Sequence, residues 1–116
     1  MGFQSLFALL LLLLPLIVTA ERKGWVPITN TSDPTVVEIG EFAVSAYNQK
    51  SKTKLVFENV IQGKILNNLS SGFLYELELN AKDESVTAKY EVGVWDNKPE
   101  KFRRLYNFQK AEVIIG

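Results

Sequence analysis

The chain has 116 residues, of which 13 are basic and 13 acidic, so its formal net charge at pH 7 is zero. This balance argues against nucleic acid or an anionic membrane surface as a partner, because both select proteins with a basic excess. The chain has neither cysteine nor histidine, which excludes disulfides, catalytic pairs built on histidine and the usual zinc sites. We expect no metal, no other cofactor and no enzymatic activity.

The first 20 residues are typical of a secretory signal peptide. Residues 6–18 form an apolar run that is shorter than the about 20 residues of a membrane-spanning helix. Val18 and Ala20 suit cleavage after Ala20, although no Lys or Arg precedes the run, and an uncleaved membrane anchor is the alternative. We predict a signal peptide at 1–20 and one secreted domain at 21–116, extracellular or vacuolar and without a membrane contact after cleavage.

Residues 21–30 are polar, contain Pro27 and predict an extended N-terminal arm. The arm ends at Asn30-Thr31-Ser32, which matches the acceptor pattern for N-glycosylation. A second match, Asn68-Leu69-Ser70, lies further along the chain. We therefore expect a glycoprotein, with Asn30 and Asn68 as candidate attachment sites.

A helix is predicted to begin at Pro34, with Asp33 as its N-cap. Apolar residues recur every three to four positions and share one helix face. The helix is expected to fade near Asn48. Gly40 lies inside it at a cost of about 1 kcal/mol relative to alanine, which indicates close approach of a strand to the helix backbone. The shared face consists of Val36, Ile39 and Ala43, with Ala46 or Tyr47.

From Leu55 onward, alternating apolar residues predict strands that bury one face. The alternation shifts phase near Asn59-Val60, which predicts a bulge. Turns are predicted at 82–85 and 96–101, and a last strand at about 103–115. The residues predicted to point inward on the two clearest strands are Phe73, Tyr75, Leu77, Leu79 and Ala81, then Val86, Ala88, Tyr90, Val92 and Val94.

One helix must cover all of these inward faces. The predicted fold is therefore α+β, an antiparallel sheet of four to five strands wrapped around one helix, in which the fifth strand would come from the N-terminal arm. The other face of the sheet is expected to remain solvated because it is rich in Glu and Lys. Residues 65–72 are expected to form a hairpin tip.

The predicted helix carries "IGEFAV" at 39–44 and "YN" at 47–48, and it resembles the helix of the plant cystatins, or phytocystatins. "GWVPI" at 24–28, "YEVGVWDNKP" at 90–99 and "FRRLYNF" at 102–108 are similar to other segments of that family. The resemblance covers the mature chain. It implies the cystatin fold, a monomeric inhibitor used in plant defence, and a papain-like cysteine protease as the partner.

The resemblance also implies a wedge of three segments that blocks the protease cleft reversibly. In this chain Lys23-Gly24 replaces two adjacent glycines, Asn68–Gly72 replaces Gln-x-Val-x-Gly, and Pro99-Glu100 replaces Pro-Trp. If these losses add, binding is weakened by about two to four powers of ten. The implied protease-binding residues are Gly24, Asn68, Leu69, Ser70, Ser71, Gly72, Pro99 and Glu100.

Other interpretations of the same segments stay open. Asn, Ser and Gly are common in any hairpin turn, so residues 68–72 on their own also fit a turn without a function. A glycan on Asn68 would put a bulky group on the tip that must enter the cleft. Trp95 is interpreted as a packing residue. The charged strip of Glu100, Lys101, Arg103 and Arg104 is interpreted as a solvated strand face, with an altered partner surface as the alternative. The alternative function is a non-inhibitory protein-binding module of cystatin fold with degenerate wedge motifs.

Overall fold

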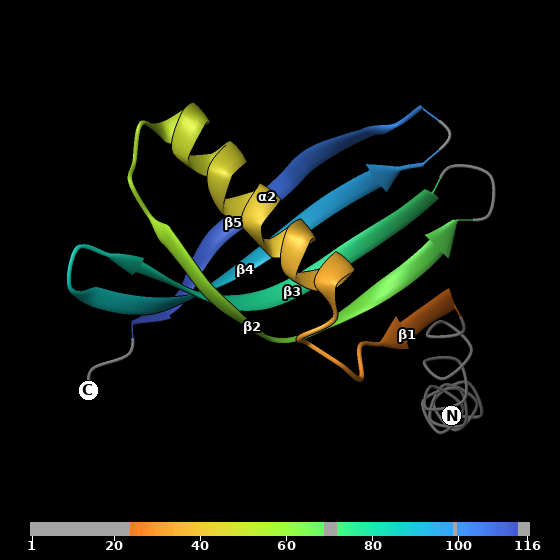
Figure 1. The fold of residues 1–116 in the computed structure, drawn as a ribbon, viewed down its shortest axis with the longest axis horizontal. Coiled ribbons are helices and arrows are strands. Elements are labelled where there is room, and N and C mark those ends of the chain that lie inside the picture. The colour runs from red at the N-terminus through yellow and green to blue at the C-terminus, as the bar shows by residue number, and fades with distance from the viewer. Residues whose placement is uncertain (1–23, 69–71, 99, 114–116) are drawn as a thin grey trace, which may run out of the picture.

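The computed structural model describes residues 24–68, 72–98 and 100–113, and these form one helix packed on a five-stranded antiparallel sheet (Figure 1). The strands are neighbours in chain order, from β1 at one edge to β5 at the other. This confirms the predicted α+β cystatin fold, including the short strand from the N-terminal arm. The elements are β1 (Trp25–Pro27), α2 (Pro34–Ser51), β2 (Val56–Asn68), β3 (Gly72–Asp83), β4 (Val86–Asn97) and β5 (Phe102–Val113).

The signal peptide predicted at residues 1–20 lies outside the described residues. Among the residues that are described, no helix combines the length and the apolar character needed to cross a membrane.

Helix α2 begins as predicted and ends later than predicted. The Asp33 side chain caps the helix by accepting a hydrogen bond from the Thr35 N–H at 2.8 Å, and Pro34 follows in the first turn. The helix continues past Asn48 to Ser51, where Lys52 adopts a left-handed conformation with φ 58°. The Lys52 N–H then bonds the Asn48 carbonyl, which is a common way to end a helix.

Asn48 does not end the helix, but it holds the turn that follows. Its Nδ2 donates to the Leu55 carbonyl at 2.9 Å, and its Oδ1 accepts from the Leu55 N–H at 3.0 Å. The Thr53 hydroxyl donates to the same Oδ1 at 2.8 Å. These bonds satisfy both ends of the amide and fix how the chain passes from α2 into β2.

The core lies between α2 and the face of the sheet that the helix covers. Gly40 is buried there, and a β-carbon at this position would lie 2.7 Å from Cε1 of Phe57 and 3.2 Å from Cγ2 of Val60. The predicted close approach of a strand is therefore confirmed, and the strand is β2. The buried hydrophobic residues are Val36, Ile39, Ala43, Val44, Leu55, Val60, Tyr75, Leu77, Leu79, Ala81, Ala88, Tyr90, Val92 and Val94.

The strands follow the predicted alternation, with one wrong assignment. The pairing of β2 with β3 shifts register between Phe57 and Asn59 and again between Val60 and Gln62, as the predicted bulge requires. Val86, predicted to point into the core, is instead 49% exposed. It begins β4 directly after a turn of only two residues, where the hairpin extends beyond the helix (Figure 1).

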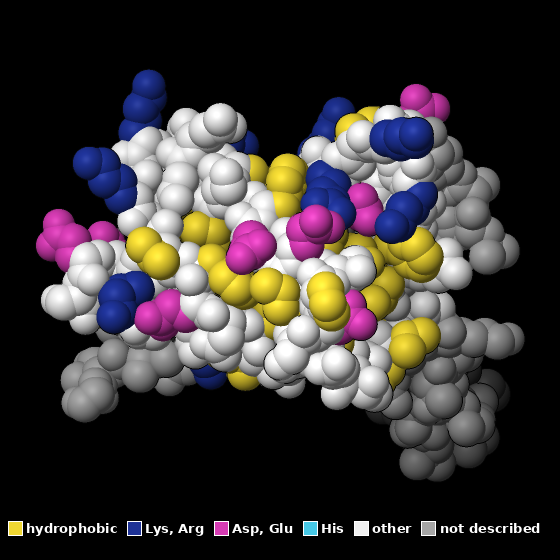
Figure 2. Space-filling model, in the orientation of Figure 1, with side chains coloured by type: hydrophobic (Ala, Val, Ile, Leu, Met, Phe, Trp, Pro, Cys, Tyr) yellow, Lys and Arg dark blue, Asp and Glu magenta, His cyan; other side chains and the backbone are white. Residues whose placement is uncertain are grey.

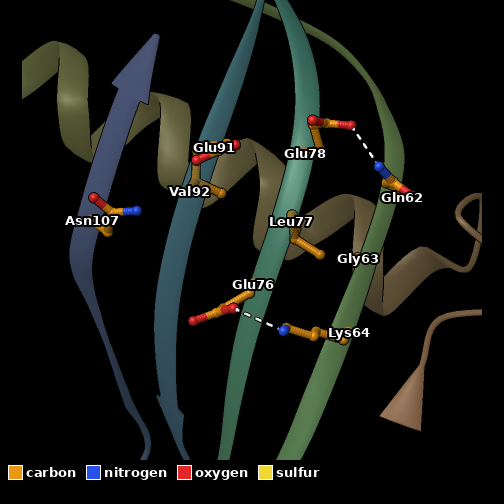
Figure 3. A pocket seen from close by; sticks show the side chains of 9 residues that line it. All are labelled: Gln62, Gly63, Lys64, Glu76, Leu77, Glu78, Glu91, Val92 and Asn107. Atoms are coloured by element: carbon orange, nitrogen blue, oxygen red, sulfur yellow. Dashed lines mark hydrogen bonds and ion pairs between the residues drawn. The ribbon is translucent and has the colours of Figure 1, made fainter. Parts of the chain in front are cut away.

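The outer face of the sheet, opposite α2, is polar in its middle. Figure 3 shows Gln62, Glu78, Lys64 and Glu76 on this face, with the helix behind the sheet. Gln62 Nε2 lies 2.8 Å from Glu78 Oε1, and Lys64 Nζ lies 3.7 Å from Glu76 Oε1. Together with neighbouring backbone they line a shallow groove of about 500 Å³. The expectation of a solvated face with Glu and Lys is confirmed.

Candidate functional site

The described parts of the three predicted wedge segments lie at one end of the sheet (Figure 1). Gly24 precedes β1, and a β-carbon there would lie 2.5 Å from the Leu66 side chain of β2. Asn68, at the end of β2, pairs with Gly72 at the start of β3. The β4–β5 connection begins after Asn97 at the same end. We call Gly24, residues 68–72 and residues 98–101 the rim.

Gly72 packs the first hairpin against the root of the second. Its φ of 105° lies in the region that favours glycine. A β-carbon at Gly72 would meet the carbonyl oxygen of Asp96 and would lie 3.0 Å from the Lys98 nitrogen. The backbone of β3 therefore approaches the start of the β4–β5 connection so closely that no side chain fits between them.

The second connection is a short turn held by its own hydrogen bonds. The Glu100 N–H donates to Asn97 Oδ1 at 3.0 Å, and the Lys101 N–H donates to the Lys98 carbonyl at 3.1 Å. Glu100 is exposed, and Lys101 has φ 58°. Pro99 lies outside the described residues, as do Leu69, Ser70, Ser71 and the side chain of Asn68. Their roles in protease binding stay predictions.

A charge cluster lies beneath the second connection, on the helix side of the sheet. Asp96 is only 5% exposed, and its Oδ1 lies 3.2 Å from Arg103 Nε across the base of the hairpin. Arg103 Nη2 also lies 2.8 Å from Glu38 Oε1 on α2, and Lys98 Nζ lies 3.8 Å from Asp96 Oδ2. The cluster thus joins α2, β4 and β5 at the rim end.

The electrostatic effects of the cluster follow from this geometry. The hydrogen bond to Glu38, with a further contribution from Asp96, raises the pKa of Arg103. Burial, and then the negative charge of Asp96, raise the pKa of the nearby Tyr75 hydroxyl. The predicted solvated strand at 100–104 is wrong for Arg103, whose side chain is partly buried between Glu38 and Asp96. The missed signal was the inward alternation of Val92 and Val94, which continues to Asp96.

Asn30 lies in the turn between β1 and α2 and is exposed. Its Oδ1 accepts a hydrogen bond from the Ser32 N–H at 3.0 Å, and its carbonyl accepts from the Asp33 N–H at 3.1 Å. The position is accessible to a glycan, whose presence stays a prediction. Across the described ranges, no three acidic side chains gather as a metal site would require.

The comparisons with known proteins agree with this architecture. The family model described as SQAPI, aspartic acid proteinase inhibitor, matches residues 28–111. Cysteine proteinase inhibitor 5 of Arabidopsis thaliana is 45% identical over 112 residues, which cover 94% of this chain and 90% of that protein.

Two further relatives carry similar names. Cysteine proteinase inhibitor 1 of Actinidia chinensis var. chinensis is 37% identical over 76% of this chain and 74% of its own length. Cystatin-1 of Zea mays is 34% identical over 72% of this chain and 60% of its own length. The Arabidopsis and Actinidia relatives are named as proteinase inhibitors and not as enzymes, which agrees with the prediction that this chain has no enzymatic activity. The chain belongs to the plant cystatin family, to which its named relatives and the matched inhibitor model assign it.

Proposed function

We propose that the protein is a secreted, reversible inhibitor of papain-like cysteine proteases that blocks the active-site cleft with its rim. The contacts come from Gly24 in the N-terminal arm, from residues 68–72, and from Pro99 and Glu100. The observation that carries the proposal is the 45% identity, over 94% of this chain, to a protein named as a cysteine proteinase inhibitor.

The geometry of the rim supports this function. Its segments are anchored by paired strand ends, and Gly72 packs the two hairpin roots against each other. A rim held in this way loses little conformational freedom when it enters a groove, so more of the contact energy appears as affinity. Ser70 and Glu100 offer less apolar contact than the family pattern, and we expect a weaker inhibitor for that reason.

The direct test is titration of the chain that follows the predicted signal peptide into papain with a small peptide substrate. We expect reversible inhibition that saturates at one inhibitor per enzyme. Ser70→Arg, in the first tip, should raise the inhibition constant at least about tenfold, because a long cation does not fit a slot one chain wide. Ser85→Arg, in the exposed turn at the opposite end of the sheet, is the matched control and should leave it unchanged.

The matched family description favours a second candidate, inhibition of aspartic proteinases. The same preparation is therefore titrated into pepsin. Inhibition of pepsin without inhibition of papain would replace the first proposal with the second. Inhibition of neither enzyme at tens of micromolar would contradict both and favour a non-inhibitory binding module.

A further inference from the structure

A row of large apolar side chains crosses the sheet directly behind the rim. The strand registers define it, because Trp25 pairs with Leu66 and Leu66 pairs with Leu74. Leu74 in turn pairs with Trp95. Directly paired residues of antiparallel strands point to the same face. On β5 the register places Arg104 opposite Trp95, and Phe102, two residues away and paired with Asn97, lies on the same face. We call Trp25, Leu66, Leu74, Trp95 and Phe102 the outer apolar band.

The band faces away from the core. The adjacent row runs through Ile65, Tyr75 and Val94, which belong to the core or pack against it. Because successive residues of a strand alternate between faces, the band points to the side opposite α2. Trp95, interpreted from the sequence as packing, lies outside the core cluster. Phe102 is 42% exposed, and the other four members are partly buried.

The two sides of the rim end therefore differ in chemistry. On the helix side, Arg103 joins Asp96 to Glu38, and Figure 2 shows basic and acidic side chains beside hydrophobic ones over that end of the strands. On the outer side, the middle of the sheet carries paired polar side chains (Figure 3), and the band borders them. Within the described part of the chain no helix or strand covers the band. The band is a continuous row of partly buried apolar side chains with one exposed member, Phe102, and Lys64 Nζ lies 4.8 Å from the centre of the Trp25 ring at its other end. Apolar surface that gathers in one place in this way marks an interaction surface.

We propose that the outer apolar band is a second contact zone of the inhibitor, which packs against an apolar lip of the protease cleft while the rim fills the groove. This inference rests on the proposed function. Leu66 and Leu74 are each two residues from the paired Asn68 and Gly72, which is about 7 Å along a strand. If the rim enters the protease cleft to a depth of about 7 Å, the outer edge of the cleft lies next to the band.

The inference also fixes the orientation of the wedge. The apolar outer face turns toward an apolar lip, and the charged helix side turns toward a polar one. The added apolar contact compensates in part for the polar residues Ser70 and Glu100 at the tips. Arg104, whose guanidinium carbon lies 5.9 Å from the centre of the Phe102 ring, provides a polar border.

The test compares two double variants in papain inhibition. Leu74→Ser/Phe102→Ser removes apolar side chains from the band. The matched control, Val56→Ser/Val86→Ser, removes two exposed apolar side chains at the opposite end of the sheet, where they are 61% and 49% exposed. We expect the band variant to bind at least about tenfold more weakly, through faster dissociation, and the control to stay within about twofold of the wild type.

Phe102→Trp is a second variant that leaves half-buried positions intact. It enlarges the band at an exposed site and should slow dissociation. Thermal unfolding of every variant is recorded, so that a loss of fold is recognised as such. Sedimentation of the wild type and the band variant tests a second copy of this chain as the occupant.

The outcomes separate the two proposals. If the wild type inhibits papain and neither band variant changes the dissociation rate, the inference is overturned and the proposed function stands. Equal losses in the band and control variants also overturn it, as does a wild-type dimer that the band variant disrupts. If the wild type does not inhibit papain, both proposals fall.

Discussion

At the scale of single residues, the packing of the rim depends on a glycine, Gly72, which has no side chain. Gly72 combines a backbone conformation that disfavours other residues with a neighbour, the Asp96 carbonyl, that leaves no room for a β-carbon. Both constraints act at the first residue of β3, where the first hairpin lies against the second. A family glycine at this position is thus explained by packing between hairpins, independently of any contact with a protease.

Gly72→Ala is expected to lower the free energy of unfolding by about 1–3 kcal/mol, because it forces a strained φ and displaces the Asp96–Lys98 backbone. Urea denaturation measures the loss. Gly24→Ala is the control, since its β-carbon would meet only the movable end of the Leu66 side chain. Equal stability of the two variants would contradict the tight packing at Gly72.

Tyr106 links stability to alkaline pH. Although Tyr106 as a whole is 46% exposed, desolvation of its hydroxyl, with the charge of Glu76, raises its pKa from 10.0 to about 12, and the hydroxyl lies 3.5 Å from Glu76 Oε2. The unfolded chain releases this proton near pH 10 while the folded chain retains it. The stabilisation is therefore fully present below pH 10 and is lost as pH rises toward about 12.

Tyr106→Phe should accordingly lose less stability than the wild type across that window. The measurement is the urea midpoint at about pH 9 and about pH 11 for both proteins. Tyr75 and Tyr90 also have raised pKa values, so both proteins lose some stability, and only the difference reports on Tyr106. Equal decreases in the urea midpoints of the two proteins would argue against a raised pKa at Tyr106.

At the scale of elements, the contact between α2 and β2 sets how the helix lies on the sheet. Gly40 has a low helix propensity, but because it lacks a side chain the ring of Phe57 and the side chain of Val60 can approach the helix backbone. A second link, from Arg103 to Glu38, ties the same helix to β5 near the rim. The helix thereby connects the core to the root of the second hairpin.

Gly40→Ala should destabilise the protein by about 1 kcal/mol, although alanine is the better helix former, because the added methyl group overpacks the contact with Phe57. Ser45→Ala, on the exposed side of α2, gains propensity without a clash and should be neutral or slightly stabilising. Urea denaturation of both variants checks this. A stabilised Gly40→Ala protein would show that β2 has room to move.

Arg103→Gln should cost about 2–3 kcal/mol, because Asp96 would remain buried with only Lys98 near it. The double variant Arg103→Gln/Asp96→Asn removes the unpaired charge and should recover part of the loss. Urea denaturation compares the two. If the double variant is less stable than Arg103→Gln alone, the loss of stability in Arg103→Gln does not come from an unpaired Asp96 carboxylate.

At the scale of the whole molecule, one helix on one face leaves the sheet with two unlike sides that meet at the rim. The helix side ends in the Asp96–Arg103 ion pair, and the outer side ends in the apolar band. Asn30 lies in the turn between β1 and α2, whereas Asn68 is the last residue of β2 and belongs to the rim. We therefore predict that a glycan at Asn30 is compatible with inhibition and that one at Asn68 interferes with it.

If Asn68 carries a glycan in the secreted protein, its enzymatic removal should strengthen inhibition of papain, because a bulky polar group no longer blocks entry of the tip. The comparison is the inhibition constant before and after deglycosylation. Asn30→Gln is the control variant, since it removes the other site while leaving the rim unchanged. If the inhibition constant is unchanged after the glycan has been removed completely, the first tip does not take part in inhibition.

Helix capping and strand alternation, which depend on neighbouring residues only, predicted several features of the fold. Asp33 and Pro34 define the start of the helix, because a cap and a residue without an N–H satisfy its first turn. Strand alternation found the inward residues of β3, since burying one face of a sheet imposes a period of two. The same rule failed at Val86, because alternation gives the face of a residue and not whether the helix reaches that far.

The sequence by itself determined the α+β class, because the spacing of apolar residues between near neighbours predicts the helix and the strands. Its resemblance to the plant cystatins indicated the family and implied the segments of the candidate site. Only the tertiary structure decided that Asp96 is buried against Arg103, that Gly72 packs two hairpins together, and that Trp95 lies in an apolar band with Leu74. These partners belong to different elements. Their contacts depend on strand register and on which face the helix covers, and both are set by the packing of the whole chain.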